Sequence, residues 1–382
     1  MILNDQNKIH TIEPAYVPIK KLSFLIDWLI TLKCNYECSY CPIGPGGHDN
    51  RRPHPTKEKC LKMLDQMYRY VDVMMQYKNP RFKDAILNIY GGEALYHPHI
   101  EEILIGSTKY FEKYSTKWTL KRRMTTNASA QLKTWKNICE HVEGFTLSYH
   151  SQSSKKMKDI FKNNIEYLLK IKKEHDIIVL MYPHKEHWAD CVEFLNFCQK
   201  NKLNFRPRLL DGKLGVYNQE QLNFLKEFFQ NKKGEMDFND VIPNKEILNQ
   251  GRACCGGRSL CLNRDLKTHE TFIPRDLGFE GWFCSANWYF LMANADTENF
   301  FTNKDCRVKL DGTTGPIATI DSMDKYILRI EELLKENKLP VMKCVQKRCL
   351  CGTCAPKSLK KENLYDIMKI YNTEAGAKNF LD

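Results

Sequence analysis

The sequence lacks long apolar runs, low-complexity segments and internal repeats. Residues 1–16 are largely polar, and the first apolar stretch, residues 22–32, is interrupted by Asp27 and is too short to span a bilayer. We therefore expect no secretion signal and no membrane span. The absence of repeats argues against a solenoid or a propeller.

Long blocks of one charge are also missing. The chain has 58 Lys and Arg against 46 Asp and Glu, a net charge of +12, but the basic residues stand in short runs such as Lys20-Lys21 and Lys172-Lys173. The excess raises the affinity for anions, including nucleic acid, without specifying one. We interpret the short runs as solvated surface rather than as a nucleic-acid-binding arm.

What the sequence has in excess is cysteine, with 16 among 382 residues. The hydrophobic content of 42% and the aromatic content of 11% indicate a folded globular protein, and the length is sufficient for two domains. Without a secretion signal we expect a cytoplasmic protein, and in a reducing cytosol cysteines serve as thiolates rather than as disulfides.

From about residue 22 to residue 210, short apolar runs alternate with longer amphipathic ones, which predicts an α/β fold with a parallel sheet and crossover helices. The predicted strands are residues 24–32, 85–90, 119–125, 144–149, 177–182 and 204–209. The predicted helices are residues 56–77, 99–114, 130–141, 155–175 and 188–201. Six strands indicate a partial (β/α)6 barrel of the TIM type. Four cysteines in these helices are expected to be buried apolar residues: Cys60, Cys139, Cys191 and Cys198.

A helical stretch at residues 219–230 and a charged, turn-rich stretch at residues 231–249 separate the barrel from a cysteine-rich region. We predict five parts in chain order: an N-terminal arm, the barrel, a linker, an auxiliary domain and a C-terminal tail. Their predicted bounds are residues 1–21, 22–215, 216–250, 251–358 and 359–382.

Three cysteines fall within eight residues directly after the first predicted strand, in the pattern Cys34-xxx-Cys38-xx-Cys41. Three thiolates on one short loop can hold three irons of a cubane cluster and leave the fourth iron without a protein ligand. A zinc knuckle with His48 as a fourth ligand is the alternative.

The second predicted strand ends in Gly91-Gly92-Glu93, and Tyr40 stands directly before the last cysteine of the loop. The cysteine spacing and the Gly-Gly-Glu motif resemble those of the radical S-adenosylmethionine (SAM) superfamily. The resemblance implies a 4Fe-4S cluster on Cys34, Cys38 and Cys41 whose open iron binds SAM. It implies reductive cleavage of SAM to a 5′-deoxyadenosyl radical that abstracts hydrogen from a substrate. It also implies an electron donor such as a flavodoxin or a ferredoxin.

The SAM contacts that the resemblance suggests lie on the cysteine loop and at strand ends: Tyr40, Gly91, Gly92, Glu93, Asn127, Ser148, Arg206 and Arg208. Glycine lets a backbone approach a ligand closely, a carboxylate accepts from an ammonium group, and arginine pairs with a carboxylate through two hydrogen bonds. In such barrels the carboxyl ends of the strands meet at the active site. A turn at Asn127 and solvation of the arginines are the alternatives.

Four further residues lie near these motifs: Ala128, His150, His97 and His99. The family's Thr-Asn-Gly is Thr126-Asn127-Ala128 here, so alanine replaces the glycine. His150 could face the substrate. We interpret His97 and His99 as surface histidines at a helix start rather than as a metal-binding pair.

A second group of cysteines closes the chain. Its core is Cys344-xxxx-Cys349-x-Cys351-xx-Cys354, and Cys255, Cys284 and Cys306 lie upstream. The group resembles the auxiliary-cluster extensions called SPASM and twitch domains, which implies at least one auxiliary 4Fe-4S cluster. The spacing departs from the usual SPASM pattern, and no cysteine follows Cys354. A zinc site on the last four cysteines is the alternative.

The resemblance therefore predicts an enzyme of the radical SAM type with a peptide or protein as its substrate. Modification of nucleic acid or of a phosphorylated small molecule is the second possibility, which suits the charge of +12. A zinc-binding interaction protein without enzymatic activity is the third.

Overall fold

The computed structural model describes most of the barrel and part of the C-terminal half. The described residues are 15–17, 23–41, 53–78, 83–115, 117–210, 217–230, 259–262, 268–271, 280–303, 306–346, 355–362 and 364–365. Cys255, Cys349, Cys351 and Cys354 lie outside them, as does His48. None of the helices in these ranges is long and apolar enough to cross a membrane.

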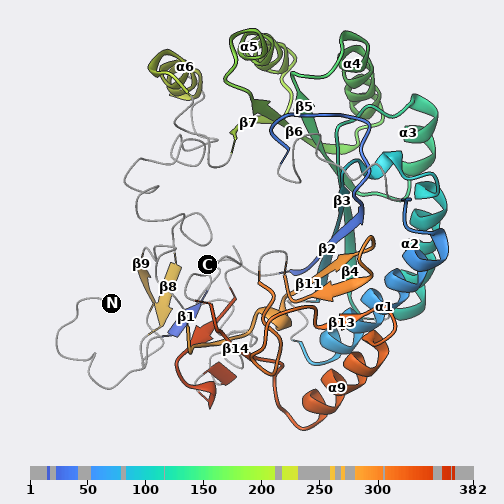
Figure 1. Cartoon of the computed structure of the whole chain (residues 1–382), viewed down its shortest axis with the longest axis vertical. Coiled ribbons are helices and arrows are strands. Elements are labelled where there is room, and N and C mark those ends of the chain that lie inside the picture. Colours follow the sequence, from blue (N-terminus) through green and yellow to red (C-terminus); the bar gives the residue numbers. More distant parts are fainter. Residues whose placement is uncertain are drawn as a thin grey trace.

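Six parallel strands stand side by side in chain order and form an incomplete barrel wall (Figure 1). They are β2 (Phe24–Thr31), β3 (Asp84–Gly91), β4 (Thr119–Thr126), β5 (Gly144–His150), β6 (Glu174–Met181) and β7 (Phe205–Leu209). The helices that follow them are α1 (Lys57–Gln76), α2 (Ile100–Tyr114), α3 (Leu132–Ile138), α4 (Lys155–Lys170), α5 (Lys185–Lys200) and α6 (Gln219–Gln230), and a short helix, η3 (Ala94–Tyr96), precedes α2. The helices line the outer side of the arc, so the predicted α/β partial barrel is confirmed.

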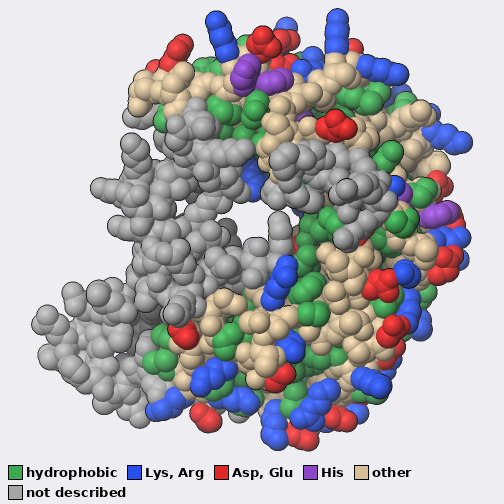
Figure 2. Space-filling model, viewed as in Figure 1, with side chains coloured by type: hydrophobic (Ala, Val, Ile, Leu, Met, Phe, Trp, Pro, Cys, Tyr) green, Lys and Arg blue, Asp and Glu red, His purple; other side chains and the backbone are tan. Residues whose placement is uncertain are grey.

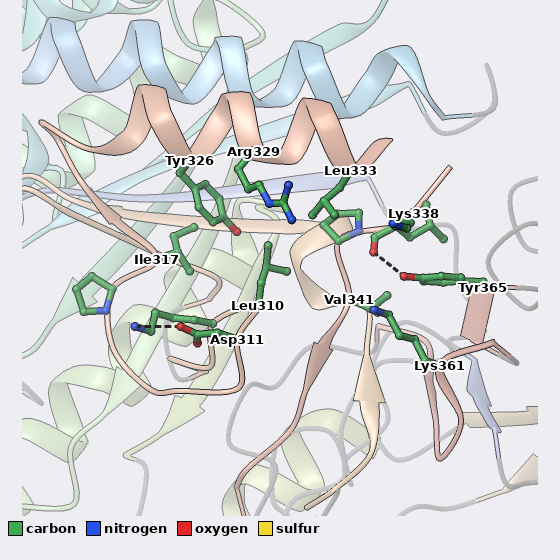
Figure 3. Close-up of a pocket in the computed structure, with 14 residues that line it drawn as sticks. Leu310, Asp311, Ile317, Tyr326, Arg329, Leu333, Lys338, Val341, Lys361 and Tyr365 are labelled. Atoms are coloured by element: carbon green, nitrogen blue, oxygen red, sulfur yellow. Dashed lines mark hydrogen bonds and ion pairs between the residues drawn. The ribbon is translucent and has the colours of Figure 1, made fainter. Parts of the chain in front are cut away.

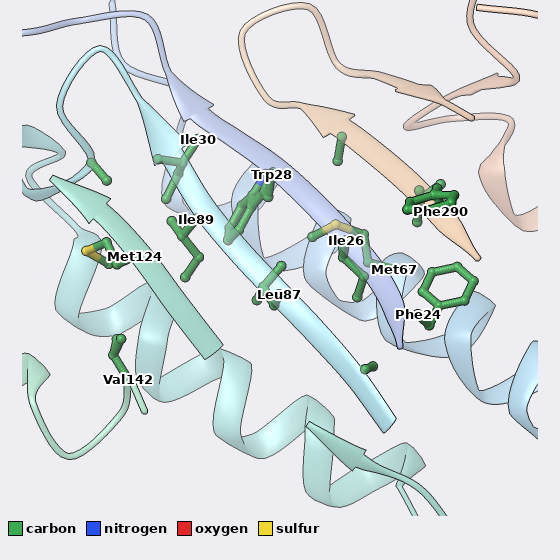
Figure 4. Close-up of a cluster of buried hydrophobic side chains, with 14 of the residues drawn as sticks. Phe24, Ile26, Trp28, Ile30, Met67, Leu87, Ile89, Met124, Val142 and Phe290 are labelled. Atoms are coloured by element: carbon green, nitrogen blue, oxygen red, sulfur yellow. The ribbon is translucent and has the colours of Figure 1, made fainter. Parts of the chain in front are cut away.

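Alternating burial along the strands explains why the sheet has one face toward the helices. In β2, Phe24, Ile26, Trp28 and Ile30 are fully buried, and the residues between them are only partly buried up to Leu29. The buried side chains join those of β3, β4 and α1 in one core (Figure 4). Because side chains of a strand point alternately to the two faces, the intervening residues face the concave side.

The structure divides the predicted helix 155–175 into helix α4 and the start of strand β6. Helix α4 ends at Lys170, and Lys172 adopts a left-handed conformation with φ of 52°. The N–H groups of Lys172 and Lys173 donate to the carbonyls of Leu169 and Leu168 at 3.0 and 2.9 Å, which closes the helix in the Schellman manner. Glycine usually marks such an ending, so lysine at this position concealed the helix end.

Part of the predicted auxiliary domain extends the barrel sheet. Strand β11 (Phe290–Asn294) pairs in parallel with β2, and β12 (Asn299–Phe301) and β13 (Ala318–Thr319) continue the sheet as antiparallel strands. Helix α9 (Met323–Lys335) lies along α1 (Figure 1). Ile320 precedes α9, and its carbonyl accepts a hydrogen bond from Gln66 Nε2 of α1 at 2.8 Å. The predicted domain bounds stay a prediction, and the structure adds that β11, β12, β13 and α9 pack with the barrel.

A second, antiparallel sheet combines short strands from both ends of the chain in the order β14-β10-β15-β1-β8-β9. These strands are β1 (Ala15–Val17), β8 (Ser259–Leu262), β9 (Thr268–Thr271), β10 (Phe283–Cys284), β14 (Met342–Lys343) and β15 (Lys357–Ser358). A short helix, η6 (Ala286–Trp288), connects β10 to β11. The predicted N-terminal arm therefore contributes a strand to the cysteine-rich half of the molecule.

Candidate functional site

The cysteine loop begins where β2 ends and lies against the end of β3. The N–H of Gly92 donates to the carbonyl of Thr31 at 2.8 Å, and the N–H of Glu93 donates to the carbonyl of Lys33 at 2.8 Å. A Cβ atom on Gly91 would lie 2.3 Å from the Thr31 carbonyl oxygen, and one on Gly92 would lie 2.3 Å from that of Lys33. These glycines let two backbone segments touch, which places the cysteine loop on the strand end.

The carboxylate of Glu93 joins the ends of β3 and β4. One oxygen accepts from the Thr126 hydroxyl at 2.6 Å and from the Leu95 N–H at 2.9 Å, and the other accepts from the Asn127 N–H at 2.6 Å. Burial raises the pKa of this carboxyl group, while the three hydrogen bonds act in the opposite direction. The structure therefore places the predicted SAM contact Glu93 among internal donors.

Asn127 links the end of β4 to the cysteine loop. Its amide nitrogen donates to Asn35 Oδ1 at 2.9 Å, and its amide oxygen accepts from the Ser129 hydroxyl at 2.6 Å. Asn35 in turn donates to that hydroxyl at 2.7 Å. Ala128, which stands where the family has glycine, adopts φ of 53°, the left-handed region that glycine favours.

His150, at the end of β5, contacts the middle of the loop. Its Nδ1 lies 2.9 Å from the hydroxyl of Tyr40 and 3.3 Å from Sγ of Cys38. The imidazole is stacked with the Tyr40 ring, and Tyr36 meets it edge-on at 5.6 Å between centroids. Burial lowers the pKa of His150 to about 4, so its imidazole is neutral at physiological pH.

The last part of the loop reaches the ends of β5 and β6. The N–H of Ser39 donates to Gln152 Oε1 at 2.9 Å, and the Ser39 hydroxyl donates to that of Tyr182 at 3.1 Å. The rings of Tyr40 and Tyr182 lie 5.2 Å apart. From β2, the loop therefore passes over the carboxyl ends of β3, β4, β5 and β6 in turn.

The three loop thiols have the donor chemistry of a cluster site. Burial raises the pKa of Cys34 to about 12 and that of Cys38 to about 11, and negative charge on the other loop thiols contributes in the same direction. Iron binding would therefore replace protons. Among the described residues no three His, Cys, Asp or Glu side chains converge as the ligands of one metal ion. A cubane needs no such convergence, because each thiolate binds a different iron.

The concave face of the barrel carries the other predicted contacts. Strand register places Ser148, Ile178 and Arg206 in one row, and His150, Leu180 and Arg208 in the next row toward the carboxyl ends. Alternation along each strand directs both rows to the same face. Arg206 has an internal partner, with its Nη2 3.4 Å from Oδ2 of Asp176. The structure thus brings Ser148 and both arginines to one face.

The expectation that both histidines beside Gly-Gly-Glu lie on the surface is wrong for His97. Its side chain is 1% exposed. Its Nε2 lies 3.0 Å from the Pro55 carbonyl, and its Nδ1 accepts from the N–H of His99 at 3.2 Å. Both ring nitrogens therefore bind backbone groups, which gives His97 a structural role.

Three cysteines of the C-terminal half, Cys284, Cys306 and Cys344, are buried. Cys284 lies in β10, and Cys344 follows β14, the strand that pairs with β10. The N–H of Cys344 donates to the Trp282 carbonyl at 2.7 Å. Cys306 lies apart from these strands, between β12 and β13. The other predicted auxiliary ligands lie outside the described residues, so the auxiliary cluster stays a prediction.

A separate hollow of about 480 Å³ lies between α9 and the segments that precede and follow it (Figure 3). Leu310, Ile317 and Leu333 supply apolar lining, and basic side chains such as Arg329 and Lys338 stand at its edge. Each of these two cations has an exposed glutamate partner, at 3.1 and 2.7 Å. On the face seen in Figure 2, lysines and arginines are likewise dispersed among acidic side chains, as predicted for solvated surface.

Sequence reasoning missed several residues of the site, among them Tyr36, Gln152 and Tyr182. Asn35 was also missed, although its place inside the cysteine loop was a usable signal. For Gln152 and Tyr182 the signal was their position within two residues of a strand end. The four helical cysteines are buried as predicted, and Cys191 donates to the Leu180 carbonyl at 3.3 Å.

No protein-family profile matches the sequence, and no curated protein matches it. Similar solved structures include SuiB from Streptococcus suis, at 14% identity and a TM-score of 0.46, where the match covers 81% of this chain and 66% of SuiB, just under two thirds of that protein. They also include anSMEcpe with bound AdoMet and the Cp18Cys peptide, at 13% identity and a TM-score of 0.47 over 94% of this chain and 98% of that one. For anSMEcpe with bound AdoMet and the Kp18Cys peptide, the identity is 14% and the TM-score is 0.45, and the match covers 74% of each chain. The strand order of this chain itself establishes its fold.

Proposed function

We propose that this protein is a radical SAM enzyme. The observation that carries the proposal is the path of the cysteine loop over the carboxyl ends of four parallel strands, held by contacts from each of them. Such strand ends are where barrel enzymes place their active sites. A purely structural zinc loop has no need of contacts to every neighbouring strand, since its ligands alone hold it.

In the proposed enzyme Cys34, Cys38 and Cys41 hold the cluster. When bound, a 4Fe-4S cluster with one open iron supplies the electron that cleaves SAM to a 5′-deoxyadenosyl radical. Glu93 and Asn127 hold the loop against β3 and β4, as the hydrogen bonds from the Glu93 N–H to the Lys33 carbonyl and from the Asn127 amide to Asn35 indicate. These two residues therefore act first as positioning residues, and direct contact with SAM is a further role that we assign to them from the family resemblance.

Ser148 and Arg208 are the proposed contacts of SAM on the concave face. A guanidinium group pairs with a carboxylate such as that of the methionine part of SAM. Arg206 lies in the row farther from the carboxyl ends of the strands, so we rank it behind Arg208. Tyr40, next to the cysteines, is the proposed contact from the loop.

A peptide or protein is the proposed substrate, on the strength of the resemblance of the C-terminal cysteines to auxiliary-cluster domains. At least one auxiliary 4Fe-4S cluster, a flavodoxin or ferredoxin as electron donor and a cytoplasmic location belong to the same proposal. An anionic substrate is the second candidate, because Lys121, Arg123 and two further arginines share the concave face. Glu174 pairs with both Lys121 and Arg123, at 2.7 and 2.8 Å, and offsets one of their two positive charges, which favours the peptide.

The test is anaerobic purification followed by measurement of iron, zinc and SAM cleavage. We expect a brown protein that forms 5′-deoxyadenosine from SAM when reduced. Replacement of Cys34, Cys38 and Cys41 together by Ala should abolish this cleavage and leave the auxiliary iron in place. A colourless zinc protein would contradict the proposal, and loss of all iron from the triple variant would contradict the presence of two separate metal sites.

A further inference from the structure

Three polar groups converge beside the cysteine loop: the Cys38 thiol, the Tyr40 hydroxyl and the His150 imidazole. The two distances to His150 Nδ1 are 3.3 Å from sulfur and 2.9 Å from oxygen. The imidazole plane lies within 3° of the Tyr40 ring, with 6.0 Å between centroids. Tyr36 packs edge-on to the same imidazole, at 86°. Rings from two directions therefore restrict the imidazole and keep Nδ1 directed at the sulfur.

The hydrogen-bond donors and acceptors among these three groups change when Cys38 binds iron. A free thiol donates weakly, so Nδ1 can act as the acceptor for Cys38 or Tyr40. An iron-bound cysteine has lost its proton and can only accept. In its Nδ1–H form the imidazole directs a proton at the thiolate, 3.3 Å away. The Tyr40 hydroxyl is also within hydrogen-bonding reach of Cys38 and provides a second donor.

We propose that His150 and Tyr40 are positioning residues that donate hydrogen bonds to the Cys38 thiolate of the loaded cluster and thereby raise its reduction potential. The inference rests on the proposed function, since it requires a cluster on Cys38. Hydrogen bonds to a cluster ligand favour the reduced state, which carries more negative charge. The end of β5 would then set how readily the cluster accepts the electron.

The experiment is an EPR-monitored redox titration of the full-length protein. The signal to follow is the component that changes when SAM is added, because only a cluster with an open iron responds to SAM. With the potential held at the wild-type midpoint, we expect the ratio of reduced to oxidised cluster to fall about tenfold in His150→Leu. For one electron a tenfold change corresponds to 59 mV. Tyr40→Phe should lower the ratio by a smaller factor, with iron per chain unchanged in both variants.

Two further variants separate hydrogen bonding from packing. Tyr182→Phe removes a hydroxyl from a ring only 5.2 Å from that of Tyr40, but this hydroxyl contacts Ser39 rather than the thiol. We expect no change in the ratio for this variant. His150→Gln keeps an N–H donor, so its ratio of reduced to oxidised cluster should lie between those of His150→Leu and wild type.

Each outcome decides between the two proposals. Unchanged ratios in His150→Leu and Tyr40→Phe, with the SAM-responsive signal and full iron present, overturn this inference and leave the proposed function standing. An equal fall in Tyr182→Phe also overturns it, because loosened packing would then explain all three variants. If wild-type protein has no SAM-responsive signal, both proposals fall together. If His150→Leu does not fold, the result for Tyr40→Phe decides alone.

Discussion

The two cysteine regions of this protein are held in place in different ways. The loop cysteines lie on irregular backbone, and side chains from neighbouring strand ends, such as Asn127 and His150, hold that backbone. Cys284 lies in an antiparallel sheet and Cys344 directly follows one of its strands; both are held by backbone hydrogen bonds, including the one from Cys344 to Trp282 at 2.7 Å. A single side-chain substitution should therefore disturb the first region far more than the second.

The largest effect is expected for Gly92→Ala. The new Cβ would lie 2.3 Å from the Lys33 carbonyl oxygen and 2.5 Å from that of Leu32, so the cysteine loop must move. A displacement of about 1 Å at a reacting centre can cost about 100-fold in rate, and we expect a loss of at least that order in 5′-deoxyadenosine formation. The C-terminal iron should be unaffected.

The matched control for this variant is Gly144→Ala, where the nearest atom to the new Cβ is 3.5 Å away, an ordinary contact. It should cleave SAM at a rate close to that of wild type. Wild-type activity in Gly92→Ala would show that the glycines do not position the loop.

Replacement of Cys349, Cys351 and Cys354 together by Ala tests the other region. We expect this variant to lose part of its iron, because these thiolates are predicted auxiliary ligands, and to keep the SAM-responsive EPR signal of the loop cluster. Iron analysis and EPR measure both quantities. If the variant folds and keeps all of its iron, the auxiliary assignment is wrong.

The third prediction concerns Lys78, which lies between strand β2 and the residues beside β11. Its Nζ is 5.5 Å from the ring centroid of Phe24 in β2 and 4.4 Å from that of Tyr289 beside β11. The side chain is 4% exposed, and burial lowers the pKa of Lys78 to about 7. Since the unfolded chain binds this proton more tightly, the free energy of unfolding should rise as the pH increases from about 7 toward 10.5.

Lys78→Met removes the charge and should raise the free energy of unfolding by about 2 to 4 kcal/mol near neutral pH, with a smaller gain at higher pH. Urea unfolding at two pH values measures this. Lys113→Met is the control, because Lys113 is an exposed lysine over the Tyr114 ring, and we expect a loss of at most about 1 kcal/mol. A gain that is equal at both pH values would refute the titration argument.

The smallest effect is expected for Ala128→Gly. Glycine removes the cost of a left-handed alanine, about 1 to 2 kcal/mol, but it also increases the entropy of the unfolded chain. The two terms nearly cancel, so the free energy of unfolding should change by at most about 1 kcal/mol, and SAM cleavage should persist. Ala128→Val should be clearly destabilised, since a β-branched residue is strained at positive φ. Equal stability of the Gly and Val variants would contradict this account.

Most of the barrel could be predicted from the sequence, because alternating burial in β2 and periodic apolar residues in α1 are local patterns. The predicted ends of β2, β3 and β4 differ from the observed ones by at most one residue. The end of α4 was missed because Lys172 occupies a position that glycine usually marks. The parallel pairing of β11 with β2 was also missed, since the two strands lie more than 250 residues apart and no local pattern records such a contact.

The candidate site likewise contains residues that the sequence reveals and residues that only the structure reveals. Cys34, Cys38, Cys41 and the Gly-Gly-Glu motif are visible in the sequence because their chemistry depends on spacing within a few residues. The roles of Glu93 and His150 depend on donors and acceptors from other strands, so only the structure reveals them. His97 illustrates the same limit, because its Nε2 contacts the carbonyl of Pro55, which lies 42 residues away in the chain.

The sequence by itself determined that this protein has a parallel α/β barrel segment with three thiols on the first loop. Both properties depend on local periodicity and spacing. The tertiary structure alone decided that the loop crosses the ends of four strands and that His150 reaches Cys38. It also decided that strand β11 pairs with β2 and extends the barrel sheet. These features arise from long-range hydrogen bonds and strand pairing, whose partners are remote in the chain and are brought together only by folding.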